Sequence, residues 1–266
     1  MTVAEVPLAL QPVRSVGRSV IDMLQTAGRV TLFAARGVRA VVSPPWFPAQ
    51  LGRQLMSVGY FSLPVVGLTA VFTGAALALN IYTGGGRFNA EQIMPQIVAL
   101  GITRELGPVL AALMLAGRVS AAMAAEIGAM RATEQIDALH TLSTDPYRYL
   151  IAPRLLATVI VMPLLVVVAD IIGIAGGWVV ATKTLDFNGA VYVKNTWDFL
   201  QSWDVESGLI KAAVFGFLVA LMGCYHGYHS SGGARGVGRA TTHAVVSAAI
   251  LIFAADYLLT SAFTHR

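Results

Sequence analysis

Five long apolar runs limit what this chain can fold into more than any other feature of its sequence. They span residues 58–81, 93–117, 155–182, 208–225 and 244–263, and none holds more than two charged residues. An α-helix needs roughly 20 predominantly apolar residues to cross the hydrocarbon core of a bilayer. We therefore predict an all-α integral membrane protein with five transmembrane helices.

The overall composition supports the same class. Hydrophobic residues make up 56% of the 266 residues and charged residues 12%, whereas a typical soluble domain has roughly 25% charged residues. Such a composition excludes an intrinsically disordered chain. The net charge of +4 does not indicate a nucleic-acid partner, because the basic residues are not interleaved with aromatic ones. The single cysteine, Cys224, excludes an intramolecular disulfide.

The distribution of basic residues between the spans predicts how the chain is oriented. Segments 1–57, 118–154 and 226–243 together hold twelve arginines, and the segments on the other side hold four basic residues. Cytoplasmic flanks carry the excess of Lys and Arg in membrane proteins. We therefore expect a cytoplasmic N-terminus, a C-terminus on the outer side of the membrane and an external loop at 183–207.

The segment before the first span has the pattern of a basic amphipathic helix. Within residues 13–42, apolar residues recur at helical spacing from Val13 to Thr31, with Arg14, Arg18 and Arg29 between them. This pattern favours a helix lying on the inner leaflet, and the alternative is a cytosolic helix packed on a partner. Prolines at 44, 45 and 48 end it. We expect residues 1–57 to form this interfacial helix and linker, and residues 58–264 the transmembrane domain.

Charged residues inside the spans indicate a polar site within the membrane. Arg104 and Glu105 lie in the second span, Lys211 in the fourth and Asp256 in the fifth. Each charge costs roughly 2.5–3.5 kcal/mol at the bilayer centre, and adjacent residues on a helix do not face each other. We predict that Glu105 pairs with Lys211, and Arg104 with water, Asp256 or a ligand headgroup. Pro108 also deprives the Arg104 carbonyl of its helical partner. The alternative is an ion pair that only locks the helix bundle.

A polar stretch between the second and third spans predicts a short cytoplasmic amphipathic helix. Its charged and apolar residues recur at helical spacing: Glu126, Met130, Arg131, Glu134 and Asp137. A helix of this kind is suited to docking a soluble motor protein, and the alternative is a helix in a solvated loop.

Sequence motifs for catalysis are absent from the chain. No phosphate-binding loop, nucleophile elbow or zinc-protease motif occurs. His226, His229 and His243 lie close together in the sequence, and we interpret them as residues flanking a membrane helix rather than as metal ligands. We therefore predict neither a catalytic residue nor a metal site.

Three motifs give the chain a specific resemblance. Residues 104–139 read RELGPVLAALMLAGRVSAAMAAEIGAMRATEQIDAL, and two further motifs lie at Ser143–Arg154 and Gly236–Val246. These motifs resemble those of the MlaE/YrbE family of ABC-transporter permeases, and the resemblance covers residues 50–264.

That resemblance implies a homodimeric permease of the bacterial inner membrane that moves phospholipid or a related lipid between inner and outer membrane and supports outer-membrane lipid asymmetry. It implies three partners: an ABC ATPase, which would bind ATP and Mg, an MCE-domain protein and a STAS-domain subunit. No cofactor is implied for this chain. By analogy, Glu126 to Leu139 is the coupling helix against the ATPase, and Arg104, Glu105 and Lys211 lie at the lipid cavity.

Two other classes remain as alternatives. An ion-coupled secondary transporter or channel would use Arg104, Glu105, Asp170 and Asp256 as a relay. The absence of a visible internal repeat argues against it. An intramembrane lipid enzyme would need a nucleophile and a base, and no such pair is recognisable in the sequence.

Overall fold

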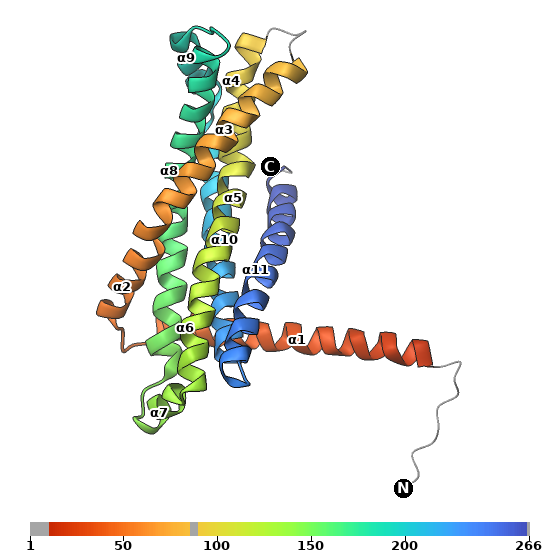
Figure 1. The fold of residues 1–266 in the computed structure, drawn as a ribbon, viewed down its shortest axis with the longest axis vertical. Helices are drawn as coiled ribbons and strands as arrows, with labels where there is room; N and C mark the ends of the chain where they lie inside the picture. Colours follow the sequence, from red (N-terminus) through yellow and green to blue (C-terminus); the bar gives the residue numbers. More distant parts are fainter. Residues whose placement is uncertain (1–10, 86–89, 265–266) are drawn as a thin grey trace.

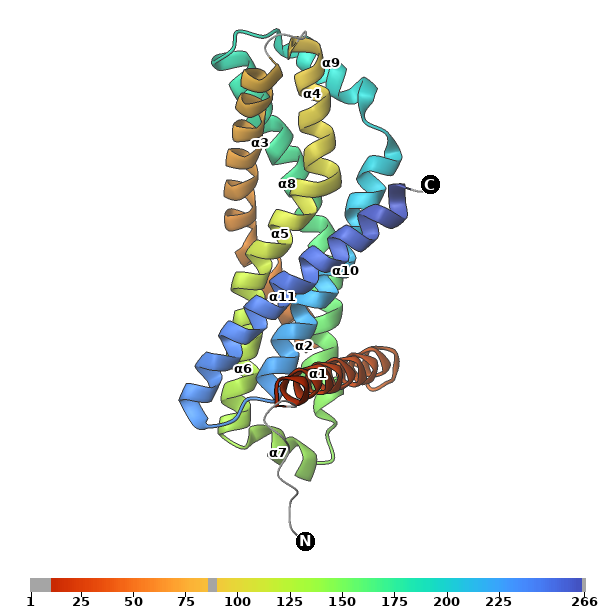
Figure 2. The ribbon, with the colours of Figure 1, turned by 90° about the vertical axis from the view of Figure 1, so that its right-hand side faces the viewer.

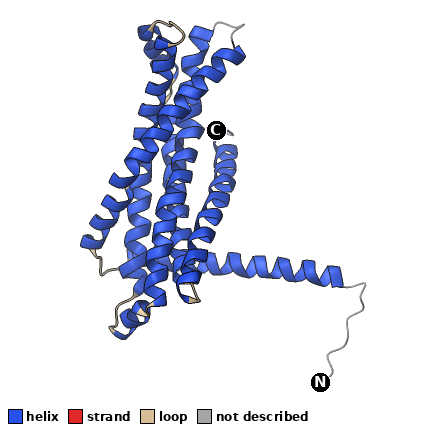
Figure 3. Ribbon diagram, viewed as in Figure 1, coloured by secondary structure: helices blue, strands red, loops and turns tan. Residues whose placement is uncertain are grey.

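The computed structural model describes residues 11–85 and 90–264, and this part of the chain is helical with short connections and no strand (Figure 3). Five of its helical stretches are long and apolar enough to cross a membrane: 48–84, 92–132, 147–183, 202–228 and 233–263. The all-α class and the five predicted spans are confirmed.

Several spans consist of more than one helical element. The first contains α2 (Pro48–Val58), the 3₁₀ turn η2 (Tyr60–Ser62) and α3 (Leu63–Gly85). The second contains α4 (Ala90–Gly101), η3 (Ile102–Leu106), α5 (Gly107–Leu115), η4 (Ala116–Ser120) and α6 (Ala121–Ala132). The third contains η5 (Tyr147–Ile151) and α8 (Ala152–Lys183), and the last two are α10 (Ser202–Tyr228) and α11 (Gly233–Thr264). The turns η3, η4 and η5 are π-helical.

The first span begins earlier than the sequence predicts. Apolar counting starts it at residue 58, whereas α2 already leads into it from Pro48. Polar residues in α2, among them Gln50 and Arg53, interrupt the apolar run and hide this part of the helix. The predicted domain boundary at residue 57 therefore falls in the last turn of α2.

Helices α8 and α10 form the centre of the bundle. Helix α8 packs between α3 and α10, and α10 also contacts α6 and α11. Glycines permit the close crossing of α3 and α8, since a methyl group at Gly74 would overlap the Gly173 carbonyl oxygen. Small residues at helix crossings are typical of membrane bundles, where the two backbones can then approach closely.

The two ends of the bundle carry different short helices. Helix α7 (Gln135–Thr141) lies at one end, and α9 (Gly189–Phe199) lies at the other, beside the ends of α3 and α4 (Figures 1 and 2). Below, these are called the α7 end and the α9 end.

Helix α1 (Gln11–Val42) runs across the bundle near the α7 end (Figure 1). Its extent agrees with the predicted helix over 13–42. Phe33 is buried against Tyr147, Tyr225 and Tyr228, which anchors its C-terminal half. Large apolar residues nearer its N-terminus, such as Ile21 and Leu24, are exposed. Its location on a membrane surface stays a prediction.

A single amphipathic helix over residues 126–139 was the wrong prediction. Helix α6 ends at Ala132, Glu134 adopts a left-handed backbone conformation with φ of 59°, and α7 starts at Gln135. The bend brings Ile136 into the core, where it is fully buried. Burying this side chain outweighs the small advantage of continuing an exposed helix, whose isolated stability is marginal at such lengths.

Candidate functional site

Five charged residues gather in the middle of the bundle, on η3, α10 and α11. We call Arg104, Glu105, Asp204, Lys211 and Asp256 the polar cluster. The Lys211 Nζ atom lies at its centre, 2.8 Å from Glu105 Oε1 and 3.0 Å from Asp256 Oδ1. It also donates to Thr260 Oγ1 at 2.7 Å. The predicted pairing of Glu105 with Lys211 is confirmed.

The π-helical turn η3 explains a further contact of Lys211. The Gly107 N–H bonds to the Ile102 carbonyl, five residues back, and Pro108 has no N–H to offer to Arg104. The Lys211 Nζ atom takes that place and donates to the Arg104 carbonyl at 3.0 Å. The carbonyl that the sequence left without a partner is thus satisfied by the ammonium group on α10.

Arg104 pairs with Asp204, and not with Asp256. Its Nε donates to Asp204 Oδ1 at 2.6 Å, while Asp204 Oδ2 accepts from the Gln201 N–H and caps α10. Asp256 instead lies against Lys211. Sequence analysis missed Asp204 because it precedes the apolar run at 208–225. An acidic residue three positions after a polar residue at a helix start is a capping signal that could have revealed it.

The polar cluster combines one deeply buried cation, Lys211, with neighbouring charged side chains that are partly exposed. Lys211 is 2% exposed, whereas the side chains of Arg104 and Glu105 are 44% and 41% exposed. The opening beside them has a volume of only about 40 Å³ and is partly lined by Trp203 and Phe263. A volume of this size holds water molecules and not a lipid. The described part of one chain therefore does not enclose a lipid-sized cavity at the cluster.

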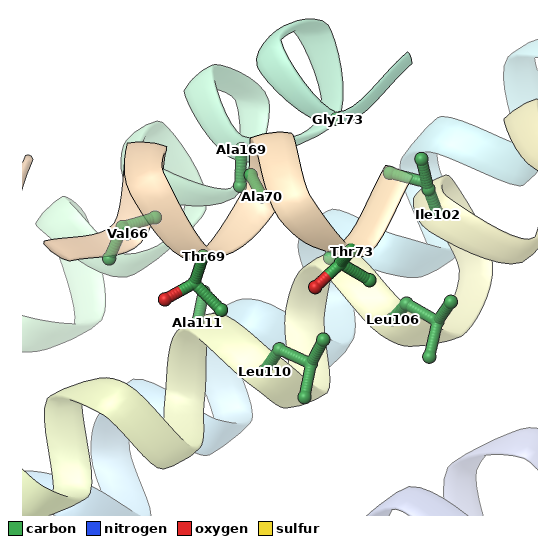
Figure 4. Close-up of a pocket in the computed structure, with 11 residues that line it drawn as sticks. Val66, Thr69, Ala70, Thr73, Ile102, Leu106, Leu110, Ala111, Ala169 and Gly173 are labelled. Carbon is green, nitrogen blue, oxygen red and sulfur yellow. The ribbon is translucent and has the colours of Figure 1, made fainter. Parts of the chain in front are cut away.

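A second small cavity lies between α3, α5 and α8. Its volume is about 20 Å³. Figure 4 shows Thr69 and Thr73 on α3 opposite Leu106 and Leu110, with Gly173 behind them. This space is about enough for one water molecule, so it reflects the packing of the three helices.

The residues predicted for ATPase coupling fall into two groups. Arg131, Glu134 and Asp137 lie at the α7 end, and Arg131 Nη1 bonds Asp137 Oδ1 at 2.7 Å across the bend. Glu126 instead bonds Arg154 of α8 at 2.8 Å, and Met130 packs against the core. Arg131 therefore pairs across the bend with Asp137 of α7.

The histidines near the α7 end contact each other and a hydroxyl group. His226 Nε2 lies 3.0 Å from Ser247 Oγ, and the His226 and His243 rings stack with centroids 5.9 Å apart. Among residues 11–85 and 90–264, no group of three or more His, Cys, Asp or Glu side chains could hold a metal ion.

Comparisons with known proteins support the resemblance. A family model described as Permease MlaE matches residues 51–262. A probable ABC transporter permease protein of Rickettsia felis is 51% identical over 96% of this chain and 99% of its own length. The intermembrane phospholipid transport system permease protein MlaE of Haemophilus influenzae is 37% identical over 94% of this chain and 96% of its own length. A probable ABC transporter permease protein of Synechocystis sp. is 39% identical over 77% of this chain and 78% of its own length.

Proposed function

Because this chain belongs to the MlaE permease family, we propose that it is the subunit through which an ABC transporter moves phospholipid or a related lipid between the inner and outer membranes. This role would support the lipid asymmetry of the outer membrane. The chain is a multi-pass membrane protein and an ABC transporter permease. The proposed location is the bacterial inner membrane.

The observation that carries the proposal is the partly exposed ion pair between Arg104 and Asp204. Its Nε is bonded to Asp204, which holds the guanidinium in place while much of the side chain stays exposed. Guanidinium N–H groups bind phosphate oxygens in a planar, bidentate geometry. Arg104 thus offers a phosphate-binding group within the second span, and Lys211 balances the neighbouring carboxylates.

The small volume at the cluster supports a homodimer. One chain leaves Arg104 and Glu105 partly exposed beside an opening of about 40 Å³. In our proposal, a second copy closes a lipid-sized space over these side chains. A bare charged surface facing the acyl chains would otherwise be costly.

The further proposed partners are an ABC ATPase, an MCE-domain protein and a STAS-domain subunit. The chain has no phosphate-binding loop, so hydrolysis of ATP with Mg would take place on the ATPase. The bend between α6 and α7 carries exposed charges of both signs, to which the ATPase would bind. The bond between Glu126 and Arg154 would link that surface to α8.

The proposed function is tested by reconstitution with the partner ATPase. We expect ATP-dependent transfer of a fluorescent phospholipid out of proteoliposomes, and native mass spectrometry should show two copies of this chain with the ATPase and bound phospholipid. Transport that runs on an ion gradient without any ATPase would contradict the proposal and favour a secondary transporter.

Charge reversal at the α7 end should weaken the ATPase complex. In the double variant Arg131→Glu with Glu134→Lys, we expect roughly tenfold weaker association, equivalent to about 1.4 kcal/mol, because two charges of the docking surface change sign and the ion pair of Arg131 with Asp137 is lost. Membrane insertion should persist. The matched control is Asp186→Lys, an exposed acidic residue with similar left-handed backbone at the α9 end. Unchanged association in the double variant would identify α7 as a solvated loop helix.

The proposed orientation predicts which end is accessible from the periplasm. In a Cys224→Ser background, a cysteine at Lys194 in α9 should react with an impermeant maleimide in intact spheroplasts, because the basic flanks place the α9 end outside. A cysteine at Thr141 in α7 should react only after lysis. The reverse labelling pattern would overturn the orientation.

A further inference from the structure

A groove lies toward the α7 end of the bundle, where the connection from α1 to α2 passes the start of α8. Its volume is about 300 Å³, and its walls come from the last residues of α1, the linker 43–47, the first turns of α2 and α8, and η5. Among the described residues that line it, Arg148 of η5 is the one that carries a charge, and most of the others are apolar. A volume of this size is at the lower end of the range for pockets that hold a ligand.

The position of the groove along the bundle is at the border of the membrane-spanning region. The first and third spans begin at residues 48 and 147. The groove is lined by the first turns of both, with Pro48 on one side and Ala152 and Leu156 on the other. Trp46 also lines it and is 70% exposed, and tryptophan is enriched where a membrane meets water. The occupant that fits this level is therefore a molecule of the bilayer and not a soluble protein.

The guanidinium of Arg148 is held at the linker wall of this groove. Its Nη1 donates to the carbonyl oxygen of Pro44, the neighbour of Pro45, which lines the groove. Its Nε lies 3.5 Å from Asp145 Oδ2. Within the described part of the chain, no hydrogen bond or ion pair uses its Nη2. Because the side chain is 36% exposed, the two Nη2 N–H groups remain available to a ligand.

The segments that form the groove carry an excess of positive charge. Residues 36–58 and 145–156 hold five arginines and one acidic residue, Asp145. Arg154 is buried and paired with Glu126 of α6. The other four arginines exceed Asp145 by three unit charges. These four are Arg36, Arg39, Arg53 and Arg148. Because basic pockets beside transmembrane helices attract anionic headgroups, this charge favours a lipid with a net negative charge.

We propose that this groove binds one phospholipid of net negative charge, with its phosphate on Arg148 Nη2 and the first part of one acyl chain against Phe47, Ala152 and Leu156. A guanidinium binds phosphate oxygens through short, charge-assisted hydrogen bonds. Since α1, the linker and α8 each contribute a wall, the bound lipid ties α1 to the bundle. The site uses no residue of the polar cluster and does not depend on the proposed transport function.

Quenching of Trp46 fluorescence tests this proposal. The triple variant Trp178→Phe, Trp197→Phe and Trp203→Phe leaves Trp46 as the one tryptophan of the full chain. In phosphatidylcholine vesicles, this variant is titrated with phosphatidylglycerol that has brominated acyl chains, and separately with brominated phosphatidylcholine, whose headgroup has no net charge. We expect half-maximal quenching at a mole fraction roughly tenfold lower for phosphatidylglycerol, because several arginines favour the anionic headgroup.

Further variants assign that preference to the groove. Arg148→Gln removes the proposed phosphate contact and should abolish most of the preference. The matched control Arg235→Gln removes the same charge from an exposed position at the start of α11, outside the groove and at the same end of the bundle (Figure 2), and should preserve it. Ala152→Leu fills the groove without changing any charge and should weaken quenching by both lipids. In native mass spectrometry, the chain with all four tryptophans should retain one phosphatidylglycerol more than its Arg148→Gln variant.

Three outcomes would overturn the proposal. Half-maximal quenching at the same mole fraction of both lipids would show that the groove takes acyl chains without recognising the headgroup. An equal loss of preference in Arg148→Gln and Arg235→Gln would show a general attraction to the basic surface at this end. Unchanged quenching in Ala152→Leu would show that the lipid lies beside the groove and not in it.

Discussion

Lys211→Ala is expected to destabilise the chain by about 3–5 kcal/mol, the usual cost of removing one partner from a buried ion pair. The variant leaves Glu105 and Asp256 without their cation and the Arg104 carbonyl without its donor. The measurement is thermal unfolding in nanodiscs alongside ATP-dependent lipid transfer. Lys194→Ala is the control, because that lysine is exposed on α9.

Further variants separate a structural from a functional role of these charges. Glu105→Ala with Lys211→Ala should recover only part of the stability, because Asp256 still lacks its cation. The triple variant Glu105→Gln, Lys211→Met and Asp256→Asn should recover more. If it unfolds like the native chain and transports normally, the cluster only locks the bundle. If it is stable and fails to transport, the charges act on the lipid. Strictly additive losses would show that the residues do not interact.

Gly208→Ala is expected to separate α10 from η3 and to weaken the two ion pairs that join these elements, Arg104 with Asp204 and Glu105 with Lys211. A methyl group at Gly208 would overlap the Thr103 carbonyl oxygen, which belongs to backbone and cannot rotate away. We expect a loss of about 1–3 kcal/mol from overpacking, and reduced lipid transfer because Asp204 and Lys211 move with α10. The same unfolding and transfer assays measure both effects.

Gly117→Ala provides a matched comparison for that variant. Gly117 lies in the second span, in η4, and an added methyl group there would meet no atom within 4 Å. Alanine should be neutral or slightly stabilising at this position. Equal unfolding temperatures for the two variants would show that α10 can shift away from η3 at little cost.

The five spans and the ion pair of Glu105 with Lys211 could be predicted from sequence, because both follow from where apolar and charged residues lie along the chain. Apolar runs near 20 residues define a helix that crosses a bilayer, and a charge within such a run needs a partner. Glu105 and Lys211 were therefore predictable as a pair. Asp204 precedes its apolar run, so hydropathy does not point to it, and only the capping pattern at the start of the helix does.

Local backbone geometry accounts for what the sequence could not predict. Helix α6 ends because Glu134 adopts a left-handed backbone conformation, for which glutamate has no intrinsic preference. The burial of Ile136 decides this bend. An isolated Asp170 within an apolar run likewise shows nothing of the close packing of its side chain against Gly107. Close contacts such as Gly208 with Thr103 likewise arise only when the helices are packed.

The π-helical turns have a consequence for the length of the second span. Each such turn holds one residue more than a regular α-helical turn, so η3 acts as a one-residue insertion between α4 and α5. Deleting a single residue there would let the helix close into regular geometry with the two sides in nearly the same orientation, whereas deleting one residue from the regular helix α5 would rotate η3 by about 100° relative to the helix beyond it. Arg104 and Glu105 would then turn away from α10. The direction in which Arg104 and Glu105 point from the helix therefore depends on the number of residues in this span as well as on their identity.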